Sequence, residues 1–141
     1  PIQDLELLGR FHDIGKIGVP ESIRNKPAKL DPCESEFMHK HCEIGHRIAQ
    51  SAPQLSHIAD LILKHHERWD GKGYPLGLAG RDIPVECRIL AIAEAYDVMT
   101  TETPYSSPMS TEDALAEIAR CAGTQFDPEM AGTFVAAMRA L

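Results

Sequence analysis

Apolar residues recur along this chain at the three- and four-residue spacing of amphipathic helices, and this period limits the possible folds more than any other feature. No convincing pair of alternating segments carries the turn residues of a β-hairpin. The period predicts helices over residues 5–12, 31–48, 55–67 and 84–101, with two more beginning at Ser110 and Asp127. We therefore expect an all-α protein, built as a helical bundle.

Several of these helices carry start signals. Asp31, Ser110 and Asp127 each stand where a side-chain oxygen can cap a helix N-terminus, and a proline or an acidic residue follows within three positions. The helix that begins at Asp31 is expected to turn one apolar face inward. That face is formed by Phe37, Met38, Ile44 and Ile48.

Length and composition narrow the class of protein. A chain of 141 residues with 43% hydrophobic residues fits one compact domain. The net charge of -7 argues against a broad nucleic-acid-binding surface, and no apolar run is long enough to predict a membrane span. The cysteines lack C-x-x-C spacing, so we interpret them as reduced thiols of a cytoplasmic protein rather than zinc-ribbon ligands. They are Cys33, Cys42, Cys87 and Cys121.

The histidines divide into two groups when they are sorted by helix face. His39, His46 and His57 fall off the apolar faces, so we expect them to point towards solvent. A single inward histidine is usually a satisfied core residue, but burying several of them costs several kcal/mol unless each is bonded. A metal site would satisfy them together. The inward group is His12, His41, His65 and His66.

Carboxylates accompany the inward histidines. Asp13 follows His12 directly, while Glu94 and Asp97 share one face of a later helix, where the alternative is an exposed charged edge. Lys16 could neutralise a phosphate oxygen or be an ordinary surface lysine. The ligand set is too large for one zinc and suits two ions of the iron, manganese or zinc class, with Asp13 placed to bridge them. It comprises His12, Asp13, His41, His65, His66 and Glu94.

Three segments of the chain resemble the HD-GYP subfamily of the HD superfamily of phosphohydrolases. His12-Asp13-Ile14-Gly15-Lys16 resembles the HD signature, and His41 with Gly45 matches the intervening H-x-x-x-G position. The block from His65 to Pro75, HHERWDGKGYP, is similar to the signature that names the subfamily. Its loop could otherwise be read as plain turn chemistry. The loop residues are Asp70, Gly71, Lys72, Gly73, Tyr74 and Pro75.

The resemblance implies an HD-domain helical bundle with the metal site between helices, and hydrolysis of cyclic di-GMP to linear pGpG and/or GMP. It implies two divalent metal ions held by the set above, Asp13 and Lys16 as catalytic residues, and Lys16 and Asp97 at the substrate. The loop is similar to one that docks a diguanylate cyclase domain in relatives.

Three departures from the family pattern limit this expectation. The chain matches a single HD-GYP domain over residues 1–141 without the N-terminal helices, which would leave one metal short of a histidine ligand. Thr103 and Ser106 stand where the family has basic residues, and Glu94 stands where it has an aspartate. Each lost charge-assisted contact is worth roughly 1.5–3 kcal/mol. The alternatives are therefore a catalytically weak regulatory module or a hydrolase of another nucleotide.

Overall fold

The computed structural model describes residues 2–24, 29–102 and 107–141, and within these ranges the regular elements are all helical. The α-helices are α1 (Ile2–Phe11), α2 (Glu21–Arg24), α3 (Pro32–His39), α4 (His41–Ser51), α5 (Ala59–Lys64), α6 (Val85–Thr100), α7 (Thr111–Arg120) and α8 (Pro128–Arg139). Short 3-10 turns are η1 (Ile14–Gly18), η2 (Ser56–Ile58) and η3 (Gly80–Asp82). The predicted all-α class is confirmed.

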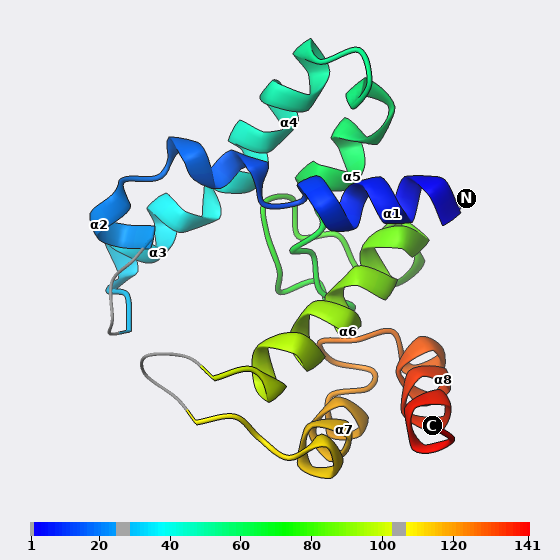
Figure 1. The fold of residues 1–141 in the computed structure, drawn as a ribbon. Helices are drawn as coiled ribbons and strands as arrows, with labels where there is room; N and C mark the ends of the chain where they lie inside the picture. Colours follow the sequence, from blue (N-terminus) through cyan, green and yellow to red (C-terminus); the bar gives the residue numbers. More distant parts are fainter. Residues whose placement is uncertain (1, 25–28, 103–106) are drawn as a thin grey trace.

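Helix α6 runs from the group of α1, α4 and α5 to the group of α7 and α8 (Figure 1), and it contributes residues to two apolar cores. Its first half packs with α1, α4 and α5, and its second half packs with α7 and α8. The first core contains Leu8, Ala49, Leu55, Ile58, Ala59, Ile62, Ile83, Cys87 and Leu90. The second contains Ile92, Leu115, Ile118, Cys121, Phe126, Ala131 and Val135. None of the helices in the described part of the chain has the length and apolar character that spanning a bilayer requires.

The predicted caps are present. Asp31 forms a complete capping box with Glu34, and the hydroxyl of Ser110 accepts a hydrogen bond from the amide of Asp113. Asp127 accepts from the amides of Glu129 and Met130 at the start of α8. These helix starts could be read from sequence because a cap satisfies backbone amides of the next turn, within three residues of itself.

Two predicted helices were wrong in their extent. The expected helix over residues 31–48 is broken at Lys40, whose amide bonds to the carbonyl of Phe37 in a tightened turn. Phe37 is 48% exposed instead of facing the core, and Ile44 and Ile48 are only half-buried, so the predicted inward face was wrong. The expected helix over residues 55–67 ends at Lys64, so His65 and His66 stand just beyond its last turn.

A buried ion pair ties α6 to the start of α8. Arg88 donates from Nη1 to Oδ2 of Asp127 at 2.7 Å, and its Nε donates to the carbonyl of Ile83. Asp127 is 5% exposed. Burial alone would raise the pKa of Asp127, but the hydrogen bonds from Arg88 and from two backbone amides outweigh it and hold the pKa below its ordinary value.

We expect Asp127→Asn to lower the free energy of unfolding by about 3 kcal/mol at neutral pH, because the amide can still cap α8 but leaves the Arg88 charge buried without a counterion. Since the folded-state pKa is depressed, the stabilisation is present above the unfolded-state pKa of about 3.9 and is lost as pH falls through the lower folded-state value. Urea denaturation of both proteins from pH 7 to pH 3 measures this difference.

The matched control is the exposed pair between Arg139 and Glu112, which also joins two helices, at 2.6 Å. Glu112→Gln is expected to cost less than about 1 kcal/mol, because solvent screens exposed pairs. A difference between wild type and Asp127→Asn that did not shrink below pH 4 would contradict the assignment to the Asp127 charge.

Candidate metal centre

Side chains from four parts of the chain converge into two adjacent groups of metal-ligating atoms. In each group, the candidate ligand atoms lie within 4.8 Å of one another. All six residues predicted as ligands belong to these groups, and Cys42, which the sequence analysis left as an ordinary thiol, belongs to the first. The first group is His41, Cys42, His65 and His66, and the second is His12, Asp13 and Glu94.

Backbone carbonyls set the orientation of three of the histidines. Nδ1 of His41 donates to the carbonyl of Met38, and Nδ1 of His65 donates to that of Ile62, both at 2.6 Å. His12 makes the same contact, over 2.9 Å, with the carbonyl three residues before it. In His41 and His65, where Nδ1 holds its proton against a carbonyl, Nε2 is left to bind a metal. Metal-bound histidines commonly have this second hydrogen bond.

The lone pairs of His41 and His65 point into a shared space. Their Nε2 atoms are 3.4 Å apart, and both side chains are 1% exposed or less. Two acceptors that face each other out of contact with water need a positive charge between them. Burial, and then the neighbouring His65, lower the pKa of His66 to about 3, which keeps its imidazole neutral. The imidazole nitrogens of His41, His65 and His66 are therefore suited to binding a metal cation.

Asp13 lies between the two groups. Its Oδ2 is 3.2 Å from Nε2 of His12, and its Oδ1 is 3.4 Å from Nε2 of His41 and 3.8 Å from that of His65. Oδ1 is buried, and within the described part of the chain no group meets it with hydrogen-bond geometry. An orphaned carboxylate oxygen beside histidine lone pairs is a fitting place for a divalent ion.

The electrostatics of the second group also favour a positive charge among its side chains. Burial lowers the pKa of His12, but hydrogen bonds to Asp13 and Glu94 outweigh burial and raise the pKa to about 10. Burial would raise the pKa of Asp13 and of Glu94, yet the neighbouring histidines hold both pKa values below their ordinary range. Lys16 adds a cation, with Nζ 3.3 Å from Oδ2 of Asp13.

Two glycines let the segment that carries Asp13 approach α4. A Cβ on Gly15 would stand 1.7 Å from the carbonyl oxygen of His41 and 2.5 Å from the amide nitrogen of Gly45. A Cβ on Gly45 would come within 3.3 Å of the amide of Gly15. The backbones therefore touch here, and this contact sets Asp13 against His41.

The loop after α5 is held to the centre by Glu67, which is 4% exposed. Its carboxylate accepts hydrogen bonds from the amides of Leu76 and Leu78, both at 2.8 Å. Tyr74 stacks between His39 and His66, with ring centroids 3.7 and 5.0 Å away. No role was predicted for Glu67 from the sequence. An acidic residue within a loop signature was the available signal, but the amides that donate to it became known only from the fold.

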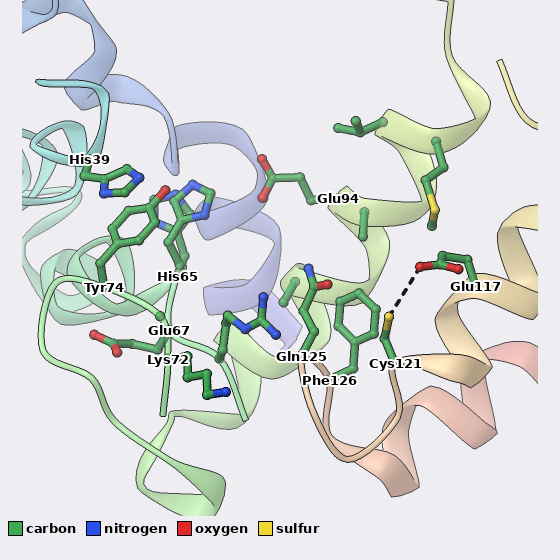
Figure 2. A pocket seen from close by; sticks show the side chains of 17 residues that line it. His39, His65, Glu67, Lys72, Tyr74, Glu94, Glu117, Cys121, Gln125 and Phe126 are labelled. Carbon is green, nitrogen blue, oxygen red and sulfur yellow. Dashed lines mark hydrogen bonds between the residues drawn. The ribbon is translucent and has the colours of Figure 1, made fainter. Parts of the chain in front are cut away.

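A cavity of about 620 Å³ extends from the first group of ligands towards α7. Figure 2 shows His39, Tyr74 and His65 on one side, Glu94 facing them from α6, and Gln125, Phe126 and Cys121 at the far end. Arg68 and Lys72 also line it, and Arg68 is paired with Asp70, whose pKa that contact lowers. A ligand pocket of ordinary size therefore opens beside the candidate metal ligands.

The remaining sequence predictions have mixed outcomes. His39 and His57 are exposed as expected, but His46 is half-buried and contacts the carbonyl of Ala59 at 3.0 Å, so the prediction that it faces solvent was wrong. Asp97 is exposed one turn after Glu94, and its carboxylate accepts a hydrogen bond from Thr101. Thr103 and Ser106 lie outside the described residues.

Comparison with known proteins places the chain in a family. The HD domain family matches residues 2–130. The chain is 41% identical over 136 residues to a cyclic di-GMP phosphodiesterase of Thermotoga maritima, covering 95% of this chain and 37% of the relative. It is 40% identical over 122 residues to 3'3'-cGAMP-specific phosphodiesterase 2 of Vibrio cholerae, covering 85% of this chain and 23% of the relative.

A solved structure shares the fold. It is a cyclic GMP-AMP specific phosphodiesterase of V. cholerae, V-cGAP3, with a TM-score of 0.71 and 23% identity, covering 97% of this chain and 38% of that one. The chain thus spans roughly a quarter to two fifths of the length of these proteins. With the HD motif, the complete loop signature and the matched family, this chain belongs to the HD domain family and is of the HD-GYP type.

Proposed function

We propose that this domain is a metal-dependent phosphodiesterase that hydrolyses cyclic di-GMP to linear pGpG and/or GMP in bacterial second-messenger signalling. The observation that carries the proposal is the pair of ligand groups joined by Asp13, next to a cavity of about 620 Å³. A bridging carboxylate between two sets of nitrogen and oxygen donors is the arrangement of two-metal phosphoesterases.

The cofactor we propose is a pair of divalent ions of the iron, manganese or zinc class. When bound, such ions neutralise phosphate charge and lower the pKa of a water molecule. His41, His65 and His66 would hold one ion, while His12 and Glu94 would hold the other, with Asp13 shared. The glutamate at position 94 keeps the charge that this position needs and reaches Nε2 of His12 at 3.5 Å.

The protein's own groups would orient the phosphodiester. Lys16 stands beside Asp13 with a side chain 39% exposed, so its ammonium can meet a phosphate oxygen at the edge of the centre. Asp97 remains a predicted substrate contact, one turn from Glu94 on α6. Arg68 and Lys72 add two basic side chains to a cavity that is also lined by Glu67, Glu94 and Glu117, so the bound ions would supply most of the positive charge for an anionic ligand.

Names of relatives support the choice of substrate. Relatives called cyclic di-GMP phosphodiesterases and relatives called 3'3'-cGAMP-specific phosphodiesterases match this chain with similar identity, 41% and 40% for the two described above. The second candidate substrate is therefore 3'3'-cGAMP, which differs from cyclic di-GMP in one base. A cytoplasmic location and a diguanylate cyclase partner, contacting the loop at residues 70–75, complete the proposal.

The test is an assay of the purified protein loaded with Mn(II) or Fe(II), given cyclic di-GMP and 3'3'-cGAMP separately, with products resolved by chromatography. We expect cyclic di-GMP to be consumed and linear pGpG or GMP to appear. Faster turnover of 3'3'-cGAMP would move the assignment to the second substrate. Bound metal without turnover of either cyclic dinucleotide would overturn the proposed enzymatic function and favour a regulatory module.

A further inference from the structure

Cys42 is buried in polar surroundings. Its side chain is 0% exposed, yet it belongs to neither of the two apolar cores of the described residues. Its Sγ lies 3.8 Å from Nε2 of His41 and within 4.8 Å of the candidate ligand atoms of His65 and His66. The thiol in this position faces imidazole nitrogens that are candidate metal ligands.

Cys87 shows what a structural cysteine looks like in the same protein. It is also buried, at 1% exposed, but it lies in the first core, and its Sγ donates to the carbonyl of Leu61 at 3.3 Å. That thiol is satisfied by the backbone of a neighbouring helix. Cys42 differs because its contact is a candidate metal ligand, so burial in a core does not account for its position.

The distances around Cys42 are close to those between ligands of one ion. In a tetrahedral site with metal–nitrogen bonds of about 2.0–2.1 Å and metal–sulfur bonds of about 2.3 Å, ligand atoms lie roughly 3.3–3.6 Å apart. The observed separations are 3.4 Å from His41 to His65 and 3.8 Å from Cys42 to His41. The two histidine lone pairs that face each other, both nine-tenths or more buried, mark independently where the ion would sit.

We propose that Cys42 is a thiolate ligand of the metal held by His41, His65 and His66. A metal–sulfur bond forms, and the thiol proton is released to solvent. This inference rests on the proposed function, because it concerns the same centre. Both ions would share Asp13, but their other ligands make the two positions chemically unequal. Three imidazoles and a thiolate select zinc-like or ferrous ions, whereas His12 and Glu94 suit harder ions such as Mn²⁺.

The test uses cobalt(II) as a spectroscopic probe of the purified protein, without any substrate. The wild type is expected to show a thiolate-to-cobalt charge-transfer band in the near ultraviolet. Cys42→Ser is expected to lose that band and to bind cobalt at least about tenfold more weakly. Cys87→Ser is the matched control, because it replaces a buried thiol away from the centre and should keep the band.

Zinc-edge X-ray absorption of the wild type measures the same bond without a variant, so a misfolded mutant does not obscure the outcome. A zinc–sulfur distance of about 2.3 Å in the spectrum supports the proposal. Bound metal with no sulfur neighbour and no charge-transfer band, or a band that persists in Cys42→Ser, overturns it. A wild-type band without phosphodiesterase activity would support the thiolate ligand and overturn the proposed function. Wild-type activity without the band would overturn the thiolate ligand and leave the proposed function standing.

Discussion

Replacing Asp13 with asparagine is expected to lower the rate of cyclic di-GMP hydrolysis by on the order of 10³-fold, the size of effect seen when a group aligned with transition-state charge is removed. Oδ1 and Oδ2 of Asp13 face different ligand groups, at 3.4 Å from His41 and 3.2 Å from His12. An amide has a similar shape but no charge, and one of its two ends is a donor. It would therefore lose one ligand bond and turn N–H hydrogens towards a cation.

Measuring the metal content distinguishes the loss of a shared metal ligand from misfolding of the variant. Elemental analysis of Asp13→Asn is expected to show loss of bound metal while the helical content stays that of the wild type. The matched control is Asp60→Asn, which removes an aspartate whose side chain is 70% exposed and paired with Lys64 on α5. If Asp13→Asn kept its metal and its activity within about tenfold of wild type, the bridging role would be wrong.

Replacing Gly15 with alanine is expected to lower the free energy of unfolding by about 3 kcal/mol or more, at the upper end of what overpacking costs, because backbone rather than a side chain would have to move. The new Cβ would stand 1.7 Å from the carbonyl oxygen of His41. Relief of that clash moves η1 away from α4 and carries Asp13 away from His41. Urea denaturation together with metal analysis measures both effects.

Gly132→Ala on α8 is the control for this substitution. Apart from its chain neighbours and its own helix backbone, no described heavy atom lies within 4 Å of the Cβ that it would add. An alanine in an exposed helix interior is expected to stabilise the protein by about 0.5–1 kcal/mol, since glycine is the poorer helix former. A Gly15→Ala protein that kept wild-type stability and metal content would show that the close approach is not required.

Local interactions explain why much of this protein could be predicted before its fold was known. Asp31, Ser110 and Asp127 were assigned as helix caps correctly, because a cap bonds amides within three residues of itself. The inward position of His12 follows from helical periodicity, which is also local, because it comes four residues after the buried Leu8. His41 is buried as predicted, but the face that it shares is formed with Cys42, Gly45 and Ala49 rather than with Ile44 and Ile48. The ligand set could be assembled from these faces and from the HD-GYP signature.

The tertiary structure decided where the chain departs from that periodicity. The break at Lys40 and the end of α5 at Lys64 place His41 and His65 beside helix ends, where each imidazole bonds a carbonyl three residues earlier. Glu67 acquired its role because the loop folds back and brings two amides to its carboxylate. None of these contacts has a period that a single segment could reveal.

The sequence by itself determined the helices, their caps and the identity of most candidate ligands, because those depend on neighbours within one or two turns. Only the tertiary structure decided that Cys42 joins the histidines, and that Gly15 must lie against His41 for Asp13 to stand between the two ligand groups. The physical reason is that a metal site is made by close approach of segments far apart in the chain, and such approaches depend on how whole helices pack.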